Sequence, residues 1–167
     1  YAMIFVAAVF VLKRSHRHVV IALVLIIPAA LLSVAAYWVP DHAWIVVPGH
    51  LLLLAFVMYM ISLILADLLL TMRVTADTIK GAVCIYLLLA LAFSMMYSLC
   101  AYFDDTAFRI VDAPEISAGA MVFHRDRFGT LVYFSLATLT TLGYGDIVPN
   151  APLTQSLAAL ESAVGPV

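Results

Sequence analysis

The chain has 167 residues, of which 66% are hydrophobic and 11% charged, and its formal net charge is −2. Soluble domains are about half apolar and about a quarter charged, so the composition excludes a soluble domain and predicts a membrane protein made of helices. No basic stripe favours a nucleic acid partner. No nucleophile, base and orienting group occur at a spacing that would indicate an enzyme.

Four apolar segments precede residue 104, and each is expected to be helical. Residues 1–12 make about 18 Å of helix, short of the roughly 30 Å hydrocarbon core, so this first span is expected to be incomplete or truncated. The next three are long enough to cross the membrane and comprise residues 19–38, 44–70 and 82–103. Pro28 is an expected kink, and the third helix is expected to start near Pro48, because proline fits a first turn.

Lysine and arginine residues set the expected orientation. Lys13, Arg14 and Arg17 lie between the first two spans, and Arg73 and Lys80 lie between the third and fourth. Both loops should therefore be cytoplasmic, which places the loop after the fourth span outside. The basic residues of the first loop would also contact anionic membrane lipids.

The fourth span is followed by a polar stretch, residues 104–127, and then by an apolar one, residues 128–140. The first is expected to be an external loop. The second is too short to span a membrane, so it is interpreted as a re-entrant helix buried within protein. A helix of a soluble core would have the same length, but this composition leaves no soluble fold to hold it.

That helix runs into the string Thr138-Leu139-Thr140-Thr141-Leu142-Gly143-Tyr144-Gly145-Asp146. Glycine adopts positive φ at low cost, so two alternating glycines let successive carbonyls turn the same way instead of alternating as in a strand. Closely spaced carbonyl oxygens of this kind can replace the water shell of a potassium ion. Taken alone, a Gly-Tyr-Gly-Asp stretch is also an ordinary turn.

The string resembles the pore helix and selectivity filter of the potassium channel family, in its two-helix pore form and in the bacterial type with extra helices before the pore. The resemblance implies that K⁺ ions bind in the filter and that no organic cofactor is needed. The ion-binding residues would be Thr141, Leu142, Gly143, Tyr144 and Gly145, with the Thr141 hydroxyl below the carbonyls.

The resemblance also implies residues that support the filter. Tyr133 and Phe134 match the aromatic pair behind it, and the Tyr133 hydroxyl is expected to reach Asp146. Ala137 stands where some members carry a carboxylate that pairs with this aspartate, so that pairing is lacking.

An inner helix is expected to run from about Pro152, and two of its residues have expected roles. Glu161 lies at membrane depth and is expected to bond the pore helix through Thr138 or Thr140 in preference to binding an ion. Gly165 falls where many members of the family have a hinge glycine.

The predicted organisation is an accessory set of transmembrane helices, residues 1–76, followed by a pore domain, residues 77–167, with a partial inner helix. One filter string cannot enclose an ion, so a homotetramer is expected. The predicted function is passive, potassium-selective conduction across the cell membrane, in bacteria the inner membrane. Two alternatives stay open: a potassium-uptake transporter, and a non-conducting membrane protein that retains a filter-like loop.

Overall fold

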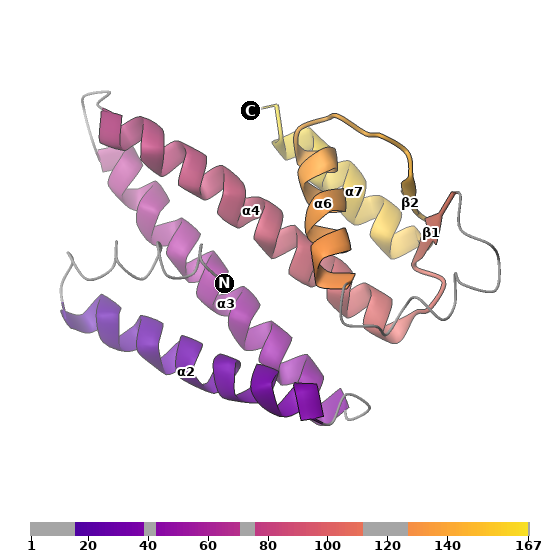
Figure 1. Cartoon of the computed structure of the whole chain (residues 1–167). Coiled ribbons are helices and arrows are strands. Elements are labelled where there is room, and N and C mark those ends of the chain that lie inside the picture. The colour runs from indigo at the N-terminus through magenta and orange to yellow at the C-terminus, as the bar shows by residue number, and fades with distance from the viewer. Residues whose placement is uncertain (1–15, 39–42, 71–75, 112–126, 167) are drawn as a thin grey trace. The chain divides into compact units, whose positions relative to one another are not determined.

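The computed structural model describes residues 16–38, 43–70, 76–111 and 127–166 (Figure 1). The expected incomplete span at residues 1–12 lies outside the described residues, as does most of the predicted external loop. The chain forms two compact units, Tyr1–Ile85 and Tyr86–Val167.

The first unit contains α2 (His16–Trp38), α3 (Ala43–Leu70) and the beginning of α4 (Ala76–Phe103). Helices α2 and α3 lie side by side and run antiparallel (Figure 1). His18 at the start of α2 contacts the Tyr59 hydroxyl, with Nδ1 and the hydroxyl oxygen 2.9 Å apart. Gly49 lies so close to the later part of α2 that an added β-carbon would be 3.2 Å from that of Leu32.

In the part of the chain that the structure describes, three helices are long and apolar enough to cross a membrane, at Arg17–Ala35, Trp44–Leu70 and Thr78–Phe103. They confirm the three complete spans that the sequence predicted, and the fold is that of an all-α membrane protein. Pro28 lies inside α2 as expected. The expected start of the third helix near Pro48 is wrong, because the apolar run before the proline is already helical from Ala43.

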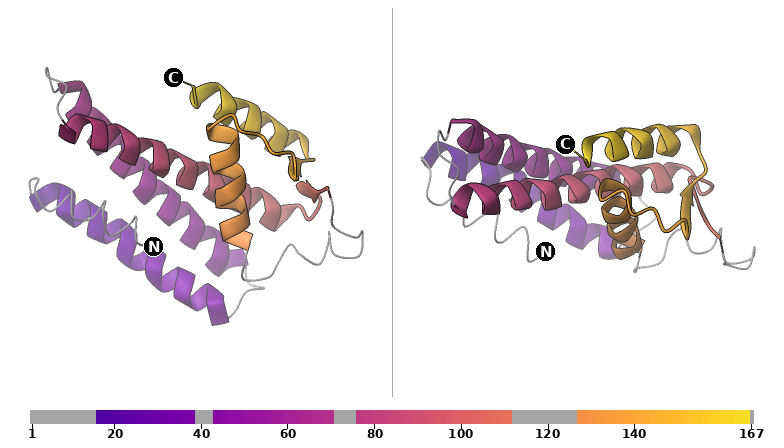
Figure 2. Two further views of the ribbon diagram at one scale, coloured as in Figure 1. Left: turned by 45° about the horizontal axis from the view of Figure 1, so that its top comes forward. Right: turned by 90° about the horizontal axis from the view of Figure 1, so that it is seen from above.

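The second unit contains the remainder of α4, β1 (Phe108–Ile110), α6 (Arg127–Leu139), β2 (Ile147–Pro149) and α7 (Pro152–Val164). Helices α6 and α7 pack against each other (Figure 2). The strands pair antiparallel, with Phe108 opposite Pro149 and Ile110 opposite Ile147. The sequence predicted α6 and the start of α7 correctly. It did not predict the two-stranded ribbon that β1 and β2 form.

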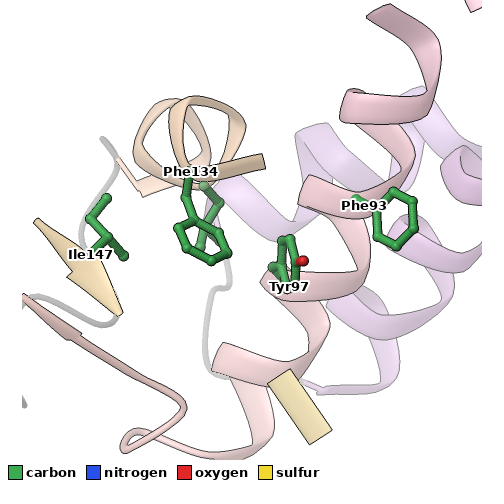
Figure 3. Packing of buried hydrophobic residues seen from close by; sticks show 5 residues of the cluster. Phe93, Tyr97, Phe134 and Ile147 are labelled. Carbon is green, nitrogen blue, oxygen red and sulfur yellow. The ribbon is translucent and has the colours of Figure 1, made fainter. Parts of the chain in front are cut away.

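An aromatic cluster holds the second unit together (Figure 3). Phe134 of α6 and Tyr97 of α4 meet edge to face with ring centroids 5.2 Å apart, and Phe108 of β1 lies 5.3 Å from Phe134. Edge-to-face pairs of this kind add to the free energy gained from burying the rings. The cluster therefore fixes α6 against the fourth span and the ribbon.

The end of α4 is tied to the start of α7 by hydrogen bonds to one carbonyl. The Ala107 oxygen accepts bonds from the Asn150 N–H and the Thr154 hydroxyl, each at 2.9 Å. Thr154 is fully buried. These bonds fix the position at which the segment after the candidate site joins α7.

Candidate ion-conduction site

The segment after α6 has an unusual backbone. Thr141, Gly143 and Gly145 have positive φ, at 57°, 53° and 78°, and Thr141 is the one non-glycine residue with this property in the described part of the chain. Every second residue from 141 to 145 thus has a backbone conformation with positive φ. A backbone of this alternating kind turns successive carbonyls toward one side, whereas a strand alternates them.

Thr141 is the feature of this backbone that the sequence did not predict. A β-branched residue at positive φ is an outlier that costs on the order of 1–3 kcal/mol and persists only where its surroundings hold it. Here its N–H donates to the Thr138 oxygen at 2.9 Å, and the following Leu142 N–H donates to the Ala137 oxygen at 2.9 Å. The end of α6 therefore holds the segment in its left-handed start.

The Thr141 hydroxyl and the two glycines are the parts of this segment that are expected to lie nearest an ion. The Thr141 hydroxyl donates to the Thr140 carbonyl at 2.7 Å, which leaves its oxygen lone pairs available. A β-carbon added to Gly143 or Gly145 would meet nothing within 4 Å. Within one chain, these glycines are therefore explained by their backbone angle and not by a lack of space.

Tyr133 supports the segment from α6. Its ring stacks on that of Tyr144, with centroids 6.2 Å apart and an interplanar angle of 7°. Its hydroxyl hydrogen-bonds the Asp146 side chain, the contact expected from the sequence. Its neighbour Phe134 points the other way, into the aromatic cluster.

The exit of the segment is tied to β1. The Val111 N–H donates to the Asp146 carbonyl oxygen at 3.0 Å, next to the pairing of Ile110 with Ile147. Asp146 also accepts a bond from the Ile147 N–H at 3.1 Å through Oδ1. The ribbon thus supports the carboxyl end of the segment, and Ala137 has no carboxylate that could pair with Asp146 there.

A short turn connects α4 to β1. Asp104 Oδ1 accepts hydrogen bonds from the Thr106 hydroxyl at 2.6 Å and from the Thr106 N–H at 2.9 Å. These bonds favour the ionised carboxyl and lower the pKa of Asp104 from its ordinary value. The turn positions Ala107, whose carbonyl holds the start of α7.

Glu161 of α7 is fully buried and contacts two hydroxyl groups. Tyr97 of α4 donates to Oε2 at 2.7 Å, and Ser135 of α6 bonds Oε1. The expected bond to the pore helix is present, but the expected partners Thr138 and Thr140 were wrong. Their hydroxyls bond carbonyls one turn back in their own helix, Phe134 and Leu136, as threonines in helices commonly do.

Gly165 ends α7 with helical angles, φ −59° and ψ −44°. A β-carbon there would lie 1.8 Å from the Leu139 carbonyl oxygen, at the end of α6. The structure thus gives close helix contact as a reason for glycine at this position. A hinge at Gly165 stays a prediction.

Sequence reasoning missed Tyr97 and Ser135 as partners of Glu161. The available signal was a hydroxyl in an otherwise apolar helix, which must find a partner at membrane depth. Both residues are fully buried.

The second unit thus combines the end of the long apolar helix α4, the short helix α6 that leads into an exposed segment with alternating positive φ, and the helix α7. A sequence model described as ion channel matches residues 82–166, just over half of the chain, and the chain belongs to this ion channel family. It is a multi-pass membrane protein of a family that conducts ions. No curated protein and no solved structure matches the chain.

Proposed function

We propose that this chain forms a homotetrameric, potassium-selective channel that conducts K⁺ passively across the cell membrane. The observation that carries the proposal is the alternation of positive φ at Thr141, Gly143 and Gly145 directly after the end of α6. This backbone can present several carbonyl oxygens to one line of ions.

The chemistry of the segment favours a monovalent cation. Its ligands are neutral carbonyl oxygens of residues 141–144 with the Thr141 hydroxyl, which suit a hard cation that gives up its water shell. The carboxyl end of α6 directs the negative end of the helix dipole toward the same segment. The carbonyl of Gly145 completes the predicted set.

Several copies are needed to surround an ion. Residues 140–146 are all exposed in the single chain, including Leu142 at 56% and Tyr144 at 66% of their surface. Four copies around one axis would cover this surface and give each ion ligands from every chain. The apolar surfaces of α2 and α3 would face lipid.

The test is electrical. The full chain is purified, reconstituted in planar bilayers, and its reversal potential is measured under a gradient of potassium against sodium. A reversal potential near that of potassium supports the proposal. Equal permeation of sodium excludes selectivity, and silent bilayers from folded tetramers favour a non-conducting protein.

The same purified protein also distinguishes the channel from the alternative function, a potassium-uptake transporter. Such transporters usually keep one of the two glycines and carry four unequal pore segments in one chain, whereas this chain has both Gly143 and Gly145. A tetramer measured by light scattering in detergent would agree with the channel. A conducting monomer would favour the transporter.

A further inference from the structure

The carboxyl of Glu161 sits at the meeting point of three helices. It is fully buried, with Tyr97 of α4 on one oxygen and Ser135 of α6 on the other. The Ser135 hydroxyl oxygen also lies 2.8 Å from the Ala90 carbonyl oxygen of α4. Three contacts thus join the inner helix, the pore helix and the outer helix.

The three contacts require three hydrogens. Each hydroxyl has one hydrogen to give, and both carbonyl and carboxylate oxygens only accept. With an ionised Glu161, Tyr97 and Ser135 supply two hydrogens, and Ser135 must leave either Ala90 or Glu161 unbonded. With a protonated Glu161, the acid donates to Ser135, Ser135 donates to Ala90, and Tyr97 donates to Oε2.

The surroundings of the Glu161 carboxyl also favour its protonated, neutral state. Among the described residues, the side chains that hydrogen-bond the carboxyl are Tyr97 from α4 and Ser135 from α6, and both hydroxyls are uncharged. A buried carboxylate without a cation is costly, because its hydration is lost without a compensating charge. A neutral acid avoids that cost and satisfies every polar group in the cluster.

We propose that Glu161 carries a proton in the conducting channel, and that this neutral acid positions the pore helix against the inner and outer helices. The inference rests on the proposed function, because the filter is what the pore helix positions. Glu161 and Gly165 lie one turn apart on α7, and they meet Ser135 and Leu139, one turn apart on α6. Loss of the proton would leave two oxygens facing each other in this contact and loosen the base of the filter.

The first experiment identifies the proton without measuring current. Infrared spectra of the reconstituted wild type and of Glu161→Gln are compared at neutral pH. We expect a protonated carboxylic acid C=O band in the wild type that is absent from Glu161→Gln. We also expect the band to move to higher frequency in Tyr97→Phe, because that variant removes the hydrogen bond to the C=O oxygen.

The second experiment measures the potassium-to-sodium permeability ratio from neutral to alkaline pH. Glutamine keeps a donor for Ser135 and an acceptor for Tyr97, so Glu161→Gln should keep the wild-type ratio within about threefold, the scale of one modest hydrogen bond. The wild-type ratio should fall at alkaline pH and that of Glu161→Gln should not. Ser162→Ala is the control and should follow the wild type, because the Ser162 hydroxyl bonds the Ala159 carbonyl of its own helix.

Four outcomes would overturn the inference. They are no carboxylic acid band in the wild type, a band that does not move in Tyr97→Phe, an intact Glu161→Gln tetramer without selectivity, and the same alkaline loss in wild type and Glu161→Gln. A normal band in a wild type that passes sodium freely is a different result. It would overturn the proposed function and support the proton on Glu161.

Discussion

A β-carbon placed on Gly165 of α7 would lie 1.8 Å from the carbonyl oxygen of Leu139, the last residue of α6. Real β-carbons do not approach a backbone oxygen this closely, so any other residue must move one of the two helices. The contact links the inner helix directly to the residue two positions before Thr141, where the left-handed segment begins.

We therefore expect Gly165→Ala to destabilise the fold and, with it, the proposed tetramer. Overpacking a close contact costs about 1–3 kcal/mol per copy, and the displaced atom here is backbone. Thermal dissociation of the tetramer in detergent measures the effect. A glycine that served only as a hinge would give normal thermal stability with altered open probability, and that result would contradict the close-contact explanation.

Gly143→Ala should abolish selective current. No atom of the same chain lies within 4 Å of the added methyl, so within the chain the effect comes from the φ of +53°, and a left-handed alanine costs about 1–2 kcal/mol per copy. Gly129→Ala is the matched control, because Gly129 lies in α6 without positive φ and also has open space around it. Reversal potentials of both variants give the answer. Normal selectivity in Gly143→Ala would show that the filter register is wrong.

The spans, the short pore helix and the start of the inner helix could be predicted because they depend on local properties. Length and hydropathy define a span, and Pro152 marks the first turn of α7. The partners of Glu161 could not be predicted in this way. Tyr97 and Ser135 are separated from it by 64 and 26 residues, and which of several hydroxyls meets it depends on how the helices rotate against each other.

The ribbon and the Thr141 backbone were missed for other reasons. Each strand has three residues, too few for alternation to be recognised. Threonine normally avoids positive φ, so its own preference argued against the observed conformation. In the structure, hydrogen bonds from the end of α6 override that preference.

The hydrogen bond from the Val111 N–H to the Asp146 carbonyl should stabilise the outer end of the filter. Val111→Pro removes this donor, while Val111→Ala keeps it and changes a side chain that is 53% exposed. We expect Val111→Pro to shorten the conducting periods severalfold in single-channel records, in line with about 0.5–1.5 kcal/mol for one bond. Equal behaviour of the two variants would show that the ribbon does not support the filter.

The Asp104 turn should respond to acid in a defined direction. Bonds from Thr106 lower the pKa of Asp104 from its ordinary value of 3.8. The stabilising effect of these bonds is therefore complete above pH 3.8 and is lost as the pH falls through the lower pKa of the folded protein. Thr106→Ala removes the hydroxyl bond and should raise the pKa toward 3.8. Titration of the Asp104 carboxyl carbon by NMR measures the shift, and an unchanged pKa would contradict the assigned bond.

Tyr133→Phe separates the two contacts that Tyr133 makes. The variant keeps the ring that stacks on Tyr144 and removes the hydroxyl that bonds Asp146. Ala137 offers no carboxylate to Asp146, so the Tyr133 bond and the ribbon are the two supports for this end of the filter. The effect of removing both supports should therefore exceed the sum of the two separate effects. We expect Tyr133→Phe to accelerate the decline of current in sustained recordings, and the double variant with Val111→Pro to lose selective current. A double variant whose loss equals the sum of the single effects would show that the two supports act independently.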